Sequence, residues 1–189
     1  MFSVALLVFL GVLGILVVWF IGMYNGLVSL RNNVRNAWAQ IDVQLKRRHD
    51  LIPNLVETVK GYAVHEKETL ENVTKARSQA VSAEGVGAQA QAEQQLTGAL
   101  GRLMLVVEQY PQLKANQNFL TLQEELTSTE NKIGFARQNY NDTVMSYNTR
   151  IESVPTNIVA GMFQFTQEEY FELQDEAPRE APKISFSTS

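Results

Sequence analysis

The segment from residue 45 to residue 66, LKRRHDLIPNLVETVKGYAVHE, concentrates the side chains that could do chemistry. It contains both histidines of the chain, three consecutive cations, several acids and a proline. A histidine beside a carboxylate could act in acid–base catalysis or bind a metal ion. The segment must therefore be compared with the motifs that carry these activities.

None of these motifs is complete. His65 and Glu66 open HEKET, which lacks the second histidine of a zinc-binding H-E-x-x-H helix. A di-iron bundle needs Glu-x-x-His pairs, but Tyr62 stands three residues before His65. The sequence has no G-x-S-x-G elbow, no phosphate loop followed by G-K-[ST], and no cysteine for a disulfide or a metal site. We expect no catalytic residue, no metal site and no cofactor, and hence a protein that is not an enzyme.

We interpret the segment instead as a corner between two helices. Asp50 is a favourable N-cap, and Pro53 would fall in the first turn of the second helix, where its missing N–H costs no hydrogen bond. Lys46, Arg47 and Arg48 would lie at the negative end of the preceding helix dipole. The same basic corner, or the acidic tail of the chain, could also bind a protein partner.

A second polar concentration lies in the last long helix that the sequence predicts. Asparagine is a mediocre helix former, yet four occur there beside two tyrosines. Two interpretations are open: a solvated face with the tyrosines in the core, or a polar network that sets helix register or meets a neighbouring subunit. The candidate interface residues are Asn131, Arg137, Asn139, Tyr140, Asn141, Tyr147, Asn148 and Arg150.

Residues 1–24 are predicted to form a transmembrane anchor. No charged side chain occurs in residues 1–23, and a helix of that length, rising about 1.5 Å per residue, covers the ~30 Å apolar core of a bilayer. A cleaved signal peptide would have a basic start, a shorter apolar run and a small-residue cleavage site. Because the first cations, Arg31 and Arg35, follow the span, the positive-inside rule predicts an external amino terminus and a cytoplasmic domain.

Residues 25–155 are predicted to form an antiparallel, up-and-down bundle of four long helices, the first continuing from the membrane span without a break. Apolar residues recur at steps of three and four, and no strand-like alternation occurs before Pro155, which ends the last helix. The last helix repeats at nearly 3.5 residues, which favours coiled-coil-like packing. The apolar seams run through residues 27–45, 55–80, 92–110 and 122–151, with Asn116 or Asn118 as a candidate N-cap for the last.

The tail, residues 156–189, is predicted to be mostly irregular, with an aromatic part followed by an acidic part. We expect its aromatic side chains to contact a neighbouring subunit or the membrane interface; they are Phe163, Phe165, Tyr170 and Phe171. The acidic part lacks the apolar surface to fold alone, although Ile184 and Phe186 could dock as a short extended segment.

In several blocks the sequence resembles the LemA family. These blocks are YNGLV at 24–28, RN at 31–32, AWAQIDVQL at 37–45, KRRHDLIPNLVETVKGYAVHE at 46–66, TENKIGFARQNYND at 129–142 and YNTRIESVPTNIVAG at 147–161. The resemblance implies one amino-terminal helix in the bacterial cytoplasmic membrane, an external amino terminus and a cytoplasmic bundle of long helices. It implies no activity and supplies no catalytic residues.

Two functions are compatible with these features. Some LemA-family members are encoded near a membrane zinc metalloprotease of the HtpX type, and one branch is linked to organelle membranes in magnetotactic bacteria. The first hypothesis is a self-associating scaffold, a homo-oligomer on the lipid bilayer, in membrane organisation or envelope homeostasis. The second is an adaptor for a membrane metalloprotease in membrane-protein quality control. Nucleic acid is not an expected partner, because the sequence shows no broad basic face.

Overall fold

The structure is a computed structural model that describes residues 2–172, and within that range it contains helices and no strand. The all-α prediction is confirmed. The acidic end of the tail, including Ile184 and Phe186, lies outside the described residues. The helices are α1 (Phe2–Lys60), α2 (Lys67–Ser82), α3 (Val86–Val107), α4 (Pro111–Lys114), α5 (Gln117–Glu152) and α6 (Thr156–Met162).

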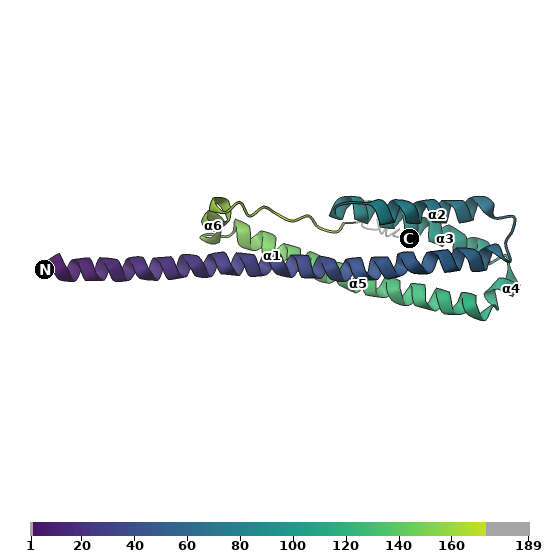
Figure 1. The fold of residues 1–189 in the computed structure, drawn as a ribbon, viewed down its shortest axis with the longest axis horizontal. Coiled ribbons are helices and arrows are strands. Elements are labelled where there is room, and N and C mark those ends of the chain that lie inside the picture. The colour runs from purple at the N-terminus through teal and green to yellow at the C-terminus, as the bar shows by residue number, and fades with distance from the viewer. Residues whose placement is uncertain (1, 173–189) are drawn as a thin grey trace, which may run out of the picture.

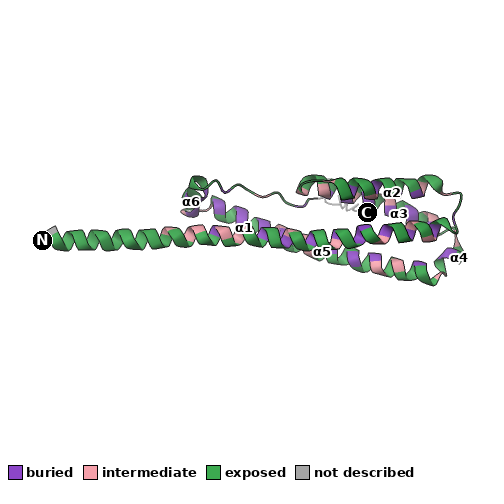
Figure 2. Ribbon diagram, viewed as in Figure 1, coloured by how far each residue is buried: buried purple, intermediate pink, exposed green. Residues whose placement is uncertain are grey.

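The helix α1 leaves the apolar segment and continues as one rod into the folded body (Figure 1). Its 59 residues correspond to a length of roughly 90 Å. Within the described residues it is the one helix long and apolar enough to cross a membrane, with a mean hydropathy of 3.0 over its most apolar stretch. That stretch is fully exposed on the protein (Figure 2). The prediction that α1 leaves the span without a break is confirmed.

The folded body consists of two helix pairs (Figure 1). In the first pair α5 packs along α1, and in the second α2 packs on α3, with α2 also resting on the far half of α1. One apolar core lies among the distal ends of these helices, and a second lies where α1 meets α5, α6 and the tail. A regular antiparallel four-helix bundle stays a prediction.

Both ends of α5 follow the sequence signals. The side chain of Asn116 caps its start, because Oδ1 accepts a hydrogen bond from the Phe119 N–H at 3.0 Å. The helix ends at Glu152, just before Pro155, and α6 begins immediately after that proline. Asn116 is therefore the N-cap, and not Asn118.

The predicted helix corner at residues 46–53 is wrong. The helix α1 passes through the whole segment and ends at Lys60, and the chain turns at residues 61–66 instead. The residues assigned to the corner are thus internal to α1: Lys46, Arg47, Arg48, Asp50 and Pro53. The physical reason is the buried seam of α1, which continues in phase across Pro53 from Leu45 to Ile52, Leu55 and Val59.

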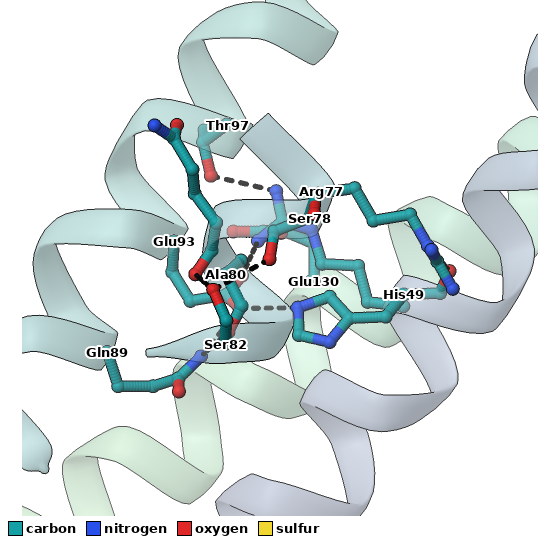
Figure 3. A network of polar contacts seen from close by, with 11 residues as sticks. His49, Arg77, Ser78, Ala80, Ser82, Gln89, Glu93, Thr97 and Glu130 are labelled. Carbon is teal, nitrogen blue, oxygen red and sulfur yellow. Dashed lines mark hydrogen bonds and ion pairs between the residues drawn. The ribbon is translucent and has the colours of Figure 1, made fainter. Parts of the chain in front are cut away.

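Pro53 leaves one carbonyl of α1 without its usual partner. A proline has no N–H to donate to the carbonyl four residues earlier, which is that of His49. The Nε–H of Arg77 on α2 donates to this carbonyl at 2.7 Å (Figure 3). Tertiary packing therefore supplies the hydrogen bond that the proline removes, and α1 can continue despite a helix-propensity cost of about 3 kcal/mol.

This arrangement predicts energetic coupling between Arg77 and Pro53. Arg77→Met keeps an apolar side chain of similar length but leaves the His49 carbonyl unpaired, so we expect it to lower the free energy of unfolding by about 1–3 kcal/mol. In a Pro53→Ala background the new N–H can donate to that carbonyl, and the same substitution should cost about 1 kcal/mol less. A double-mutant cycle on the full chain in detergent, followed by urea unfolding, measures the difference. Equal costs in the two backgrounds would contradict this account.

Candidate functional site

A buried ionic cluster joins three helices near the middle of the folded body (Figure 3). Arg48 and His49 belong to α1, Glu93 to α3 and Glu130 to α5. Arg48 Nη1 lies 3.2 Å from Glu93 Oε2 and 3.1 Å from Glu130 Oε2. His49 Nε2 lies 2.6 Å from Glu93 Oε1. With the bond from Arg77 to the His49 carbonyl, all four long helices of the body meet at this point.

Further polar groups complete the cluster. Arg48 Nη2 donates to Thr97 Oγ1 at 2.8 Å, and Gln89 Nε2 lies 3.1 Å from both Glu93 Oε1 and the Ala80 carbonyl oxygen. Arg48, His49 and Glu93 are each between 4% and 7% exposed. Charges at such depth destabilise a fold unless they are paired and hydrogen-bonded, and here both oxygens of Glu93 have partners.

The contacts of the cluster link side chains of α1, α3 and α5. Both oxygens of Glu93 and both Nη atoms of Arg48 have partners in the cluster, and within residues 2–172 no three His, Asp or Glu side chains are placed to hold a metal ion. The second histidine, His65, lies apart in the exposed turn after α1. The two histidines that drew attention in the sequence therefore do not form one site.

The three consecutive cations do not form a common surface either. Arg48 is buried, whereas Lys46 and Arg47 are exposed, and Arg47 lies 4.0 Å from Glu125 on α5. Asp50 is exposed. A partner that binds these cations from solvent would contact Lys46 and Arg47 and not Arg48; the adaptor hypothesis stays a prediction.

Glu93 is the residue that sequence reasoning missed. It occupies a position three residues before Leu96 and seven before Leu100, in the buried seam of α3. A charge within an apolar seam was the available signal, and Arg48 carries the same signal three residues after Leu45. Two opposite charges, each at a core position of a different helix, predict a buried pair.

The tail forms a second polar site, where asparagines of α5 hold its backbone. Asn148 accepts from the Glu168 N–H at 3.0 Å and donates to the Glu168 carbonyl at 2.9 Å. Asn141 makes the same pair of bonds with Phe171, at 2.9 and 3.3 Å. Between them, the Tyr140 hydroxyl donates to the Glu169 carbonyl at 2.8 Å. We call Asn141, Asn148 and Tyr140 the tail clamp.

The tail clamp decides between the two interpretations of the asparagines. Asn141 and Asn148 belong to a polar network, but this network faces the chain's own tail and not a neighbouring subunit. The tyrosines, Tyr140 and Tyr147, are buried as expected. Of the other candidate interface residues, Asn131, Asn139 and Arg150 are exposed and Arg137 is half-buried.

The aromatic tail residues pack on α1 of the same chain. The Phe171 ring centroid lies 6.0 Å from that of Trp38, and the Phe165 ring lies 5.8 Å from Tyr24. Arg31 Cζ lies 4.9 Å from the centre of the Phe165 ring. Phe165 and Phe171 are buried, so the expectation that they contact a neighbouring subunit or the membrane is wrong. Phe163 and Tyr170 remain partly exposed, at 48% and 38%.

The ionic cluster predicts unequal costs for its two acids. Glu93→Ala leaves Arg48 and His49 buried without their shared partner, and we expect the free energy of unfolding to fall by about 3–5 kcal/mol. Glu130→Ala removes a half-exposed partner while the Arg48–Glu93 pair remains, and should cost about 1 kcal/mol or less. Urea unfolding of the full chain in detergent, followed by circular dichroism, compares the two. Similar costs would show that the buried pair is not the dominant contact.

The tail clamp predicts sensitivity to high pH. Burial, aided by the carboxylates of Glu168 and Glu169, raises the pKa of Tyr140 to about 12. Because the pKa is higher in the folded state than the ordinary value of about 10, the stabilising effect of this tyrosine is complete below about pH 10. It is lost as the pH rises from about 10 to about 12.

Tyr140→Phe tests this pH dependence. At neutral pH we expect the substitution to cost about 1 kcal/mol, because the bond to the Glu169 carbonyl is lost. That difference from the unsubstituted chain should vanish between about pH 10 and about pH 12, as measured by urea unfolding at each pH. A difference that stays constant over this range would show that Tyr140 does not ionise within the folded tail clamp.

The sequence comparisons agree with this architecture. The model of the LemA family matches residues 37–186. Protein LemA of Metamycoplasma hominis is 30% identical, over 82% of this chain and 71% of that protein. Magnetosome protein MamQ 2 of Paramagnetospirillum magneticum is 27% identical over 79% of this chain, and magnetosome protein MamQ of Magnetospirillum gryphiswaldense is 25% identical over 78%.

The chain covers 64% of the length of each of these two MamQ proteins. Neither the LemA nor the MamQ name denotes an enzyme family. Together with the exposed apolar helix, these relatives indicate a membrane-associated protein and are consistent with a bacterial membrane anchor. With the family model matching most of its residues, the chain belongs to the LemA family.

Proposed function

We propose that this chain is a non-enzymatic, single-pass membrane scaffold that self-associates through the outer face where α1 and α5 meet. The observation that carries the proposal is the exposure of two large apolar side chains on that face. Phe135 on α5 is 74% exposed and Val43 on α1 is 62% exposed. They line a shallow groove that we call the Phe135 face, formed by Ala39, Gln40, Val43, Gln44, Lys132, Phe135, Ala136 and Asn139.

The chemistry of the Phe135 face suits a second copy of the same chain. Its centre is apolar and its edges carry side-chain amides, which both donate and accept hydrogen bonds, so that the face can complement itself across a twofold axis. Lys132 is its one charged residue. Two long helices, α1 and α5, present the face, which lies outside the buried seam between them.

The docked tail supports the same conclusion. Since Phe165 and Phe171 are buried against their own chain, they are not available for assembly, and Phe135 is the most exposed aromatic side chain among the described residues. The relatives named as magnetosome proteins support a role at membrane surfaces. A scaffold of this kind would act in membrane organisation or envelope homeostasis.

Phe135→Gln tests the self-association. Because the side chain is exposed, the substitution should leave the helix content unchanged while it weakens the association at least about tenfold, as expected when about 1.5–3 kcal/mol of apolar burial is lost. Analytical ultracentrifugation in detergent measures the oligomer size. Leu105→Gln is the matched control, because Leu105 is 70% exposed on α3, outside the Phe135 face. An unchanged oligomer, or equal weakening by both substitutions, would refute the proposed interface.

The orientation is part of the same proposal, with the amino terminus outside and the folded body in the cytoplasm. Its support is the position of Arg31 and Arg35 after the apolar span. The chain has no cysteine, so a single Ser82→Cys at the exposed end of α2 can report its location. Gly85 is less suitable because its φ of +87° would strain any other residue.

Labelling with a membrane-impermeant maleimide reads out the orientation. We expect Ser82→Cys to react only after lysis, and Ser3→Cys, at the other end of the span, to react in cells with a permeabilised outer membrane. Both residues are exposed in the structure. The reverse pattern would place the folded body outside the cytoplasmic membrane.

A further inference from the structure

The short helix α6 has one buried face and one exposed apolar face. Thr156, Val159 and Ala160 are buried against α1 and α5. On the other side Ile158 and Met162, one helical turn apart, are 60% and 65% exposed. With Phe163, which is 48% exposed, they give the end of α6 three exposed apolar side chains, and grouped apolar side chains can mark a membrane or protein contact. The surroundings of α6 indicate what covers this face.

The position of α6 is at the end of the membrane span (Figure 1). Phe163, which follows α6 directly, lies with its ring centroid 4.7 Å from that of Tyr24 and 6.1 Å from that of Phe20. Residues 3–19 of α1 are exposed, and burial begins at Phe20, where α6 and the tail come alongside. A span of about 20 residues starting at the beginning of α1 ends at this level.

Neither α6 nor the turns of α1 beside it carry a charged side chain, and the first cation of α1, Arg31, lies over the Phe165 ring. Residues 153–167, which include α6, carry no charged side chain. On α1 the first charged residue, Arg31, lies about 16 Å beyond Phe20 along the helix axis. The region also gathers aromatic rings, namely Trp19, Phe20, Tyr24 and Phe163. An uncharged, aromatic belt beside an apolar span is typical of residues at a membrane–water interface.

We propose that α6 is an interfacial helix that lies on the bilayer surface, with Ile158, Met162 and Phe163 in the boundary between headgroups and acyl chains. The apolar surface of the span is continuous with that of α6 through the contact of Phe20 with Phe163. The bilayer already surrounds one side of this contact, so the same lipid covers the exposed face of α6. The protein thereby rests on the membrane at two points, the span and α6.

A fluorophore at residue 162 tests the proposal. Met162→Cys in this cysteine-free chain is labelled with nitrobenzoxadiazole and reconstituted at one copy per phosphatidylcholine nanodisc. Nitroxide-labelled lipids then quench the fluorophore from near the glycerol backbone or from the end of the acyl chain. Leu105→Cys, also highly exposed but on α3 in the distal body, is the matched control. Circular dichroism of the same samples checks that both variants are folded.

We expect the label at residue 162 to emit at shorter wavelength than the control and to be quenched several-fold more strongly by the shallow nitroxide. The deep nitroxide should quench it less than the shallow one. Quenching equal to that of the control would place α6 in water and overturn the proposal, and a short-wavelength emission without lipid quenching would place it against protein. Because each disc holds a single copy, the result does not depend on self-association through the Phe135 face.

Discussion

The pairing of Glu93 with Arg48 and His49 is the constraint on which the arrangement of the helices depends. A carboxylate at 4% exposure is strongly destabilising unless it lies within hydrogen-bond distance of its partners, so the positions of α1 and α3 along each other's axes cannot shift by a turn. Apolar seams alone tolerate such shifts, because neighbouring turns present similar side chains. The ionic cluster therefore selects one register among several that apolar packing would allow.

The tail is held by α5 and packs on α1. Asn141 and Asn148 stand two turns apart on α5, and the amide of each pairs with both the N–H and the C=O of one tail residue, as a neighbouring strand would. These hydrogen bonds involve only backbone atoms of the tail and therefore do not select its sequence. The buried rings of Phe165 and Phe171 determine which tail residues lie between α1 and α5. The tail thus packs along α1 of its own chain. It completes the apolar core between α1, α5 and α6 without a contribution from a second copy.

The sequence predicted the helical class, the continuation of α1 out of the apolar span and the ends of α5, because periodicity and capping are local properties. It misplaced the first turn for the same reason. Asp50 and Pro53 satisfy local rules for a helix start, but the buried seam across Pro53 and the bond from Arg77 to the His49 carbonyl outweigh them, and both depend on residues far along the chain. The hydrogen-bond partners of Asn141 and Asn148 could not be predicted from the sequence either, because an extended tail segment has no periodic pattern of apolar residues.

Because α1 is one continuous helix, the depth at which it sits in the bilayer determines how far from the membrane surface each helix packed on it lies. Val43 lies 23 residues beyond Phe20, which corresponds to about 35 Å along the axis. A helix supported by α5 over this distance bends only gently, so every copy in one bilayer presents its Phe135 face at nearly the same height. In the proposed scaffold, anchored copies would meet face to face by lateral diffusion alone, at an effective concentration far higher than in solution. An interface with as few apolar side chains as the Phe135 face can be sufficient for assembly under that condition.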